Sequence, residues 1–218
     1  MKSITPTSFY SLLETKFPHT PTATQSVALQ KLAVFTLSSI KDEVFLLKGY
    51  AGTGKTTLIG TLVNSLWKVQ KKAVLMAPTG RAAKVMSNYS NTQAFTIHRK
   101  IYFPKKQSGG GVQFVLAPNK HRDTLFIVDE ASMIPDTAAD SKLFENGSLL
   151  DDLMMFVYSG HKCKLLLIGD TAQLPPVHLV LSPALDADRL SLNYNKEVVR
   201  LELEEVVRQA GDSGILAN

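Results

Sequence analysis

The sequence predicts an α/β fold in which a doubly wound parallel sheet carries helices on both faces. Four short apolar runs indicate buried strands, namely Val44–Leu47, Ala73–Ala77, Leu125–Val128 and Lys164–Ile168. Helical patterns lie between them, and this alternation is typical of a parallel sheet built from βαβ units. Small or polar residues follow each run directly, so the motifs are expected at the carboxyl ends of the strands, where ligands of such sheets bind.

The first strand is followed by a glycine-rich loop and a helical pattern. The loop, Gly49–Thr56, has the form G-x-x-x-x-G-K-T, which binds nucleotide phosphates when it joins a strand to a helix. Its backbone N–H groups can form an anion-binding nest, and the helix N-terminus adds partial positive charge. Lys55 is expected to reach the β- and γ-phosphates of ATP, and the Thr56 hydroxyl is expected to hold Mg²⁺. The residues predicted to bind the nucleotide here are Gly49, Ala51, Gly52, Thr53, Gly54, Lys55, Thr56 and Thr57.

The helices predicted between the strands are Lys55–Val69, Arg81–Ser90 and Leu149–Tyr158. In Ile101–Leu116, two β-prone arms flank a Gly-rich turn, which favours a β-hairpin inserted into one βα unit, within the block 101–118. An unstructured surface loop is the alternative there. In Thr137–Ser148, mixed polarity favours a surface loop with a short helix. Val198–Leu203 is predicted as a further strand, and Ser213–Asn218 as the first turn of a helix.

The bulk composition bounds the architecture and the environment. With 218 residues, 44% of them hydrophobic, the chain can bury one substantial core but is too short for two full α/β domains. The net charge of +5 fits a polyanionic partner without requiring one. The single cysteine, Cys163, excludes an internal disulfide and suits a cytoplasmic location, with a buried thiol just before an apolar strand. No apolar run approaches the roughly 18 residues that span a bilayer, so we expect no membrane partner.

Asp129 and Glu130 follow the strand Leu125–Val128. An Asp at such a strand end can bind Mg²⁺, and the adjacent Glu can activate the attacking water as general base. Beside a phosphate loop this spacing indicates the hydrolytic centre, whereas the alternative is a solvated turn. Gln173 lies in the segment GDTAQLPPV after the next strand. Its amide could contact both a γ-phosphate and a nucleic-acid surface, although a purely structural turn would have a similar composition.

Basic and polar residues after the second strand indicate a contact with a nucleic-acid backbone. In APTGRAAK, residues 77–84, Thr79 or Gly80 would begin a helix whose free N–H groups can bind a phosphate. Arg81 adds positive charge there, and a simple helix cap is the alternative. His98 could donate a hydrogen bond to a phosphate or merely cap a turn.

Two further side chains are candidates from their residue type. Gln25 lies near the start of a helix, and a glutamine amide can bind the N6 and N7 edges of adenine. Arg208 could reach a γ-phosphate, although an ordinary surface arginine is equally compatible with its surroundings.

In their order along the chain, these motifs resemble the N-terminal RecA-like motor domain of superfamily 1 helicases of the RecD and Dda type. The resemblance extends from about Thr20 to Asn218. It rests on GYAGTGKTT (49–57), APTGRAA (77–83), TIH (96–98), VDEASM (128–133), GDTAQLPPV (169–177) and VVRQ (206–209). The resemblance implies a P-loop NTPase fold, ATP and Mg²⁺ as cofactors, single-stranded DNA as partner, and movement from 5′ to 3′.

The resemblance also implies roles for individual residues. On the nucleotide side these are Gln25 at the adenine, Lys55 and Thr56 at the phosphates and magnesium, Asp129 and Glu130 as the magnesium-binding and catalytic pair, and Gln173 and Arg208 at the γ-phosphate. On the DNA side they are Pro78, Thr79 and His98. The hairpin is similar in placement to the small inserted domain that acts as a strand-separating pin.

The sequence does not contain the family's second RecA-like domain, which carries an arginine finger and half of the DNA track. We therefore expect the chain to be the first half of a helicase core, with that second domain as its partner. Three alternatives are the motor subunit of an exonuclease complex, a P-loop ATPase that does not translocate, and a catalytically silent nucleotide-binding module. The segments APTGRAA and TIH argue against the second, and the intact Lys55, Asp129 and Glu130 argue against the third.

Overall fold

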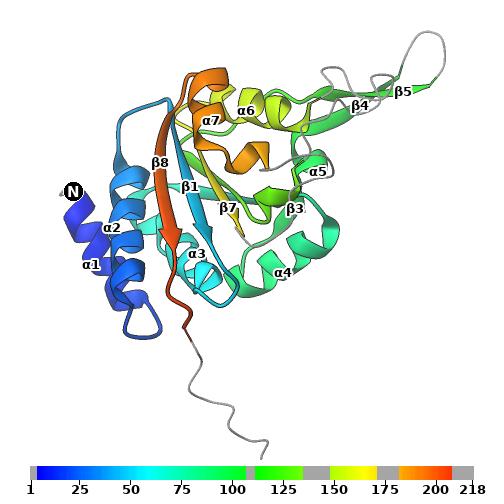
Figure 1. Cartoon of the computed structure of the whole chain (residues 1–218). Coiled ribbons are helices and arrows are strands. Elements are labelled where there is room, and N and C mark those ends of the chain that lie inside the picture. Colours follow the sequence, from blue (N-terminus) through cyan, green and yellow to red (C-terminus); the bar gives the residue numbers. More distant parts are fainter. Residues whose placement is uncertain (1–3, 107–110, 135–147, 171–181, 208–218) are drawn as a thin grey trace, which may run out of the picture.

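The predicted parallel sheet forms the centre of the fold. The computed structural model describes residues 4–106, 111–134, 148–170 and 182–207. Within these residues, six strands lie in the order β3-β2-β6-β7-β1-β8, and every neighbouring pair is parallel (Figure 1). Their bounds are β1 (Glu43–Gly49), β2 (Lys72–Ala77), β3 (Ala94–Thr96), β6 (Thr124–Val128), β7 (Lys164–Gly169) and β8 (Glu197–Leu203). The α/β fold class is confirmed, and the five predicted strands agree with these bounds to within two residues.

Helices cover both faces of the sheet because successive strand side chains point to opposite sides. The helices are α1 (Pro6–Lys16), α2 (Ala23–Leu37), α3 (Lys55–Val63), α4 (Gly80–Ser90), α5 (Ile97–Ile101), α6 (Leu149–Ser159) and α7 (Ala187–Tyr194), with short 3-10 turns η1 (Leu66–Val69), η2 (Ala131–Met133) and η3 (Pro183–Leu185). Phe45 and Leu47 of β1 are buried in one cluster with residues of α1, α2, α3 and α4. Val44 and Leu46 of the same strand are buried in a second cluster with residues of α5, α6 and α7.

The two N-terminal helices begin at capping boxes. Thr5 caps α1, and Thr22 caps α2 by accepting the N–H of Gln25, whose side chain in turn accepts the N–H of Thr22. This reciprocal pair satisfies two backbone donors that a helix N-terminus otherwise leaves free. The start of α2 near Gln25 is therefore as predicted, whereas α1, β3, α5 and α7 lie outside the predicted elements.

The helix predicted over Lys55–Val69 is shorter in the structure. α3 ends at Val63, and η1 follows as a separate turn. The hydroxyls of Thr61 and Ser65 each donate to the carbonyl four residues earlier, and such bonds compete with the helical ladder. Gln70 then adopts a φ of 58°, which ends the segment before β2.

A β-hairpin is inserted between α5 and β6, as predicted. β4 (Tyr102–Lys106) and β5 (Val112–Leu116) pair antiparallel in a sheet of their own, which projects from the body of the molecule (Figure 1). At its base the Tyr102 hydroxyl donates to Asp152 of α6 at 2.5 Å, and the N–H of Ala117 donates to the carbonyl of Ile101 at 2.7 Å. The hairpin is therefore attached to the core at both ends.

Other predictions have mixed outcomes. Cys163 is buried as expected, and its burial raises the pKa of the thiol. Nearly all of the loop predicted over Thr137–Ser148, and the helical turn predicted over Ser213–Asn218, lie outside the described residues. In the part of the chain that the structure describes, no helix is long and apolar enough to cross a membrane.

A buried ion pair connects the sheet to α2. Lys164, at the start of β7, lies 2.6 Å from Glu43 at the start of β1, and its ammonium also donates to the carbonyl of Phe35 at 2.9 Å. The side chains of Lys164 and Glu43 are 11% and 7% exposed. Removing one partner would leave the other charge buried without compensation, which is far more costly than replacing both.

We predict that Glu43→Ala lowers the free energy of unfolding by about 3 kcal/mol or more, because Lys164 then loses its counter-charge. The double variant Glu43→Leu with Lys164→Met should recover most of that loss. Urea denaturation followed by circular dichroism measures both, and a double variant no more stable than the single one would contradict this account of the pair.

Candidate functional site

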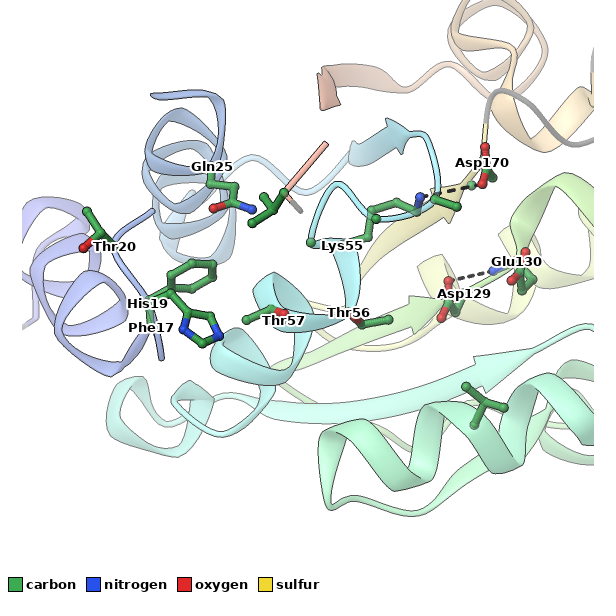
Figure 2. A pocket seen from close by; sticks show the side chains of 16 residues that line it. Phe17, His19, Thr20, Gln25, Lys55, Thr56, Thr57, Asp129, Glu130 and Asp170 are labelled. Atoms are coloured by element: carbon green, nitrogen blue, oxygen red, sulfur yellow. Dashed lines mark hydrogen bonds and ion pairs between the residues drawn. The ribbon is translucent and has the colours of Figure 1, made fainter. Parts of the chain in front are cut away.

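A pocket of about 860 Å³ lies at the carboxyl ends of β1, β6 and β7, beside the first turn of α3 (Figure 2). Pockets of this size accommodate small-molecule ligands and cofactors. Of the residues predicted to bind the nucleotide, all except Gly49 and Thr53 line the pocket, and Asp129 and Glu130 line it as well. Gly49 and Thr53 belong to the same glycine-rich loop but are buried. Motifs from separate parts of the sequence therefore meet in one cavity.

The glycine-rich loop is folded by its own polar groups. The hydroxyl and the N–H of Thr53 both donate to the carbonyl of Tyr50, at 2.8 and 3.4 Å. Gly52 and Gly54 have φ values of 80° and 89°, a region that glycine enters without steric cost. Gly54 is the N-cap of α3 and provides no side-chain hydrogen bond. The first N–H groups of α3 are therefore not used by a capping side chain, and their partial positive charge suits an anion.

Lys55 is held against the loop. Its ammonium donates to the carbonyls of Gly49 and Tyr50 at 2.6 and 2.8 Å, and it lies 4.0 Å from the carboxylate of Asp170. The side chains of Lys55 and Asp170 are only 15% and 12% exposed. Because a lysine ammonium has three N–H donors, one remains beyond those given to the two carbonyls. By turning its N–H groups away from these carbonyls, the Lys55 ammonium can donate hydrogen bonds to an anion bound in the pocket.

Asp170 is a site residue that the sequence predictions did not single out. It follows β7 in the way that Asp129 follows β6, and it lines the pocket beside Lys55 (Figure 2). The sequence does contain a signal for Asp170, namely its position directly after an apolar strand, because the carboxyl ends of parallel strands lie at one edge of the sheet. The predicted residue of that segment, Gln173, lies outside the described residues.

Asp129 and Glu130 form the acidic side of the pocket. The N–H of Glu130 donates to one carboxylate oxygen of Asp129 at 2.9 Å, and the N–H of Asp129 donates to the carbonyl of Met76 at 3.0 Å. Glu130 has a φ of 56° and a ψ of 37°, which is the left-handed region that costs a residue with a Cβ free energy. Two features stabilise this strained backbone. One is the hydrogen bond from the N–H of Glu130 to Asp129, and the other is the 3-10 turn η2, which begins at the next residue.

Tyr89 of α4 supports Asp129 from the other side. Its hydroxyl donates to the second carboxylate oxygen of Asp129 at 2.8 Å. Burial, and then the charge of Asp129, raises the pKa of the Tyr89 hydroxyl far above its usual value, so it remains a donor. The carbonyl of Tyr89 also approaches α3 closely at Gly60. A Cβ added at Gly60 would lie only 3.2 Å from this carbonyl oxygen. The local sequence around Tyr89 gives no signal of this role, because its partner Asp129 is 40 residues away.

Gln25 lines the pocket but its amide is already engaged. Its oxygen accepts the N–H of Thr22 at 3.1 Å, and its nitrogen donates to the carbonyl of Thr53 at 3.0 Å. The side chain therefore joins the start of α2 to the glycine-rich loop. One amide hydrogen and one lone pair remain for a base in the pocket, so the predicted adenine contact stays a prediction.

Three neighbours of Gln25 extend the pocket away from the loop. Phe17, His19 and Thr20 connect α1 to α2 and line the same end of the cavity as Gln25 (Figure 2). An aromatic ring and an imidazole offer flat faces against which a planar ring can stack. The sequence offered no periodic signal for these residues, because their role depends on how α1 packs on α2.

The chain after β8 returns to the glycine-rich loop. The N–H of Val207 donates to the carbonyl of Gly52 at 2.9 Å, and Val207 lines the pocket. Arg208, the predicted γ-phosphate residue, follows Val207 in the sequence but lies outside the described residues. Its predicted role is therefore not tested.

The predicted DNA-contacting residues gather beside the pocket rather than in it. Thr79 caps α4 by accepting the N–H of Ala82 at 3.2 Å, and Arg81 is exposed in the first turn. β2 and β3 are neighbours, with Ala77 opposite Thr96, so Pro78 and His98 follow adjacent strand ends. Partial burial lowers the pKa of His98, which favours a neutral imidazole.

The backbone of Gly54 leads to a stability prediction. A Cβ at this position would lie 2.4 Å from the Gln25 amide nitrogen, and the φ of 89° is unfavourable for alanine. We predict that Gly54→Ala lowers the free energy of unfolding by about 1–2 kcal/mol or more. Gly80→Ala is the matched control, since no atom lies within 4 Å of its Cβ position. Urea denaturation compares the two, and equal stability would mean that the loop accommodates a side chain.

Comparison with known proteins gives a consistent result. The family model for the AAA domain (AAA_19) matches residues 30–179. The ATP-dependent RecD2 DNA helicase of Deinococcus radiodurans is 32% identical over 171 residues, which cover 78% of this chain and 20% of that protein. The ATP-dependent DNA helicase Dda of Enterobacteria phage T4 is 30% identical over 166 residues, covering 74% of this chain and 34% of that protein.

A solved structure gives the same fold. The crystal structure of the Pif1 helicase from Candida albicans superposes with a TM-score of 0.52 and 22% identity, covering 88% of this chain and 41% of that chain. The chain spans about a fifth to a third of the length of the two curated relatives. This chain belongs to the AAA domain family, and its relatives include two proteins named as ATP-dependent DNA helicases.

Proposed function

We propose that this chain is the first RecA-like motor domain of an ATP-dependent DNA helicase, which hydrolyses ATP to translocate on single-stranded DNA. The observation that supports this most strongly is the position of Asp129 and Glu130 across one cavity from Lys55 and the glycine-rich loop. The residues predicted to contact DNA follow the neighbouring strands β2 and β3, so the two proposed sites share one edge of the sheet.

The pocket residues have distinct roles in this proposal. The N–H groups of the glycine-rich loop and the Lys55 ammonium bind the phosphates of ATP. Glu130 takes the proton of the attacking water, for which its carboxylate must face the γ-phosphate. Gln25, with Phe17 and His19 nearby, borders the end of the cavity where the base would lie. Asp170 lies 4.0 Å from the Lys55 ammonium and provides a counter-charge beside it.

Magnesium is the metal that suits the oxygen donors of this site. The Thr56 hydroxyl and the Asp129 carboxylate line the same cavity, and Mg²⁺ prefers one or two such protein ligands together with phosphate oxygens. When bound, Mg²⁺ would neutralise charge on the phosphates. Asp129 enters this role already oriented, because both of its oxygens accept hydrogen bonds from the protein.

We also propose that a second RecA-like domain closes over the nucleotide. Ala51, Gly52 and Thr56 are exposed at the mouth of the pocket in the described part of the chain. That domain would supply the arginine that stabilises the transition-state charge in related phosphoryl-transfer enzymes, an element worth about 10³–10⁵ in rate.

The hairpin β4–β5 is proposed to act as a strand-separating pin. Its projection from the body of the molecule (Figure 1) would permit this role.

The experiment that tests the function measures ATP hydrolysis stimulated by single-stranded DNA in the full-length protein that includes the proposed second domain, and in its Glu130→Gln variant. We expect turnover to fall roughly 10²–10⁴-fold while the affinity for ATP changes little, since a general base acts mainly in the transition state. Glu202→Gln, an exposed residue of β8, is the control. Unchanged turnover with a large loss of ATP affinity would make Glu130 a ligand instead. An absence of any DNA stimulation in the unaltered full-length protein would argue against the motor.

Tyr89 is proposed to position Asp129 rather than to touch the substrate. We predict that Tyr89→Phe, which keeps the packed ring, lowers turnover about 10-fold, since a hydrogen bond to a charged group contributes about 1.5–3 kcal/mol. The variant should also need several-fold more Mg²⁺ for half-maximal activity and for tight binding of a non-hydrolysable ATP analogue. Tyr194→Phe removes a hydroxyl that donates to Asp151 outside the pocket and is the control. A variant with reduced thermal stability but an unchanged Mg²⁺ dependence would assign Tyr89 a structural role only.

A further inference from the structure

The edge of the sheet opposite the pocket carries a cluster of positive charge. Three adjacent strands, β2, β6 and β7, begin at this edge. The residues before or at their starts are rich in lysine, arginine and histidine: Lys71 and Lys72 at β2, Lys120, His121 and Arg122 at β6, and His161 and Lys162 at β7. We call these seven residues the basic edge. The proposed function makes no use of them.

Backbone hydrogen bonds hold the basic edge in a fixed arrangement. The N–H of Lys72 donates to the carbonyl of Asp123, the N–H of Asp123 donates to His161, and the N–H of His161 donates to His121, at 3.0, 2.9 and 3.2 Å. Arg122 and His161 also form a parallel bridge that continues the sheet beyond its strands. The three turns therefore present their side chains from a continuous hydrogen-bonded platform.

Asn119 fixes the central turn further. Its side-chain nitrogen donates to the carbonyls of Phe156 and Val157 at the end of α6, at 2.8 and 3.2 Å. Its side-chain oxygen accepts the N–H of His121 at 2.9 Å. Lys120 lies between these two anchored positions, so the backbone that carries its charge is held at both sides.

The positive charge at this edge is poorly compensated. Asp123 is paired with Lys71 at 3.0 Å, and the pKa of this carboxyl is lowered by Lys71 and also by Lys162 and His161. Among the described residues, no ion pair involves Lys72, Lys120, Arg122 or Lys162, all of which are exposed. The carboxylates further along, Asp42 and Glu43 at β1, are paired with Lys196 and Lys164.

A small cleft beside the basic edge is also lined by cationic groups. It has a volume of about 220 Å³ and is bordered by Lys100 of α5, Lys120, His121, Ala117 and Pro118 at the foot of the hairpin, and Phe156. The pKa of His121 is lowered by burial and then by the charges of Lys100 and Lys72. Like charges are thus crowded around a hollow of a size that admits a phosphate group.

We propose that the basic edge and this cleft bind the sugar-phosphate backbone of a nucleic acid, at a site that extends beyond the single-strand contacts near Thr79 and His98. Rows of lysine and arginine bind phosphates without regard to base sequence. The cleft adjoins the hairpin, whose β4 strand adds exposed Lys105 and Lys106. The inference rests on the proposed helicase function, because a duplex meeting the hairpin would have its backbone close to this edge.

A membrane surface fits these observations less well than a nucleic acid. Binding to anionic lipid combines cations with exposed apolar side chains that enter the interface. In the cleft, the apolar members Ala117 and Pro118 are small, and Phe156 is 3% exposed. The basic edge therefore offers charge and hydrogen-bond donors but little apolar surface.

The test compares two double variants that lose the same charge. Lys72→Ala with Lys120→Ala alters the basic edge, whereas Lys16→Ala with Lys31→Ala alters exposed lysines of α1 and α2 on a distant face. Fluorescence anisotropy with a short DNA duplex, and with a single strand of equal length, is measured over a range of salt concentrations. Thermal unfolding and binding of a fluorescent ATP analogue check that the fold and the pocket are unchanged.

We expect the basic-edge variant to bind at least one of the two DNAs about 10-fold more weakly and to lower the slope of log affinity against log salt by about two, since each phosphate contact contributes nearly one. The control should bind like the unaltered protein. Equal binding by both double variants, with DNA binding by the unaltered protein intact, overturns this inference alone. The inference is also overturned if the basic-edge variant keeps its affinity for DNA but loses binding to vesicles of an anionic phospholipid, measured by co-sedimentation. If the unaltered protein binds no DNA, the proposed function itself fails.

Discussion

The parallel register of β2, β6, β7 and β1 is the constraint on which the site depends. These strands are buried on both faces, and every neighbouring pair runs in the same direction. Their carboxyl ends therefore meet at one edge, which brings together a glycine-rich loop, Asp129 and Asp170 from segments up to about 120 residues apart. A single reversed strand would remove its motif from the pocket, because the motifs occupy only one end of each strand.

Within this arrangement, α4 contacts both of the proposed binding regions. Its first turn carries Thr79 as cap and Arg81, while its last turn carries Tyr89, which donates to Asp129. The helix also packs against α3, where Gly60 allows the close approach of the Tyr89 carbonyl. A displacement of α4 would therefore alter the position of the Asp129 carboxylate and the backbone near Thr79 together. This gives a physical route by which nucleotide and DNA binding could affect one another.

The two edges of the sheet differ in charge. The carboxyl edge combines loop N–H groups and Lys55 with three carboxylates, which suits a metal-bound polyphosphate. The opposite edge carries mainly cations on short turns, held by a chain of backbone hydrogen bonds. Because the strand interiors are buried in the core, the polar side chains of the sheet itself lie mainly at these two edges. The fold thus places the proposed nucleotide site and the proposed binding site for a polyanionic backbone at opposite edges of the sheet.

Much of this protein could be predicted from local sequence. Short apolar runs indicate buried strands, so the fold class followed from pattern. The loop from Gly49 to Thr56 indicates a phosphate-binding turn because a strand and a helix flank it. The acidic pair Asp129 and Glu130 followed from its spacing after a strand. Other features depend on packing between distant segments: the hydrogen bond from Tyr89 to Asp129, the Lys55–Asp170 contact and the placement of Phe17 and His19 beside Gln25. The end of α3 at Val63 was likewise mispredicted, because the chain turns there into η1 although the apolar pattern continues. Local patterns record which residues are apolar or polar, whereas the partner of a polar group depends on which elements the core brings into contact.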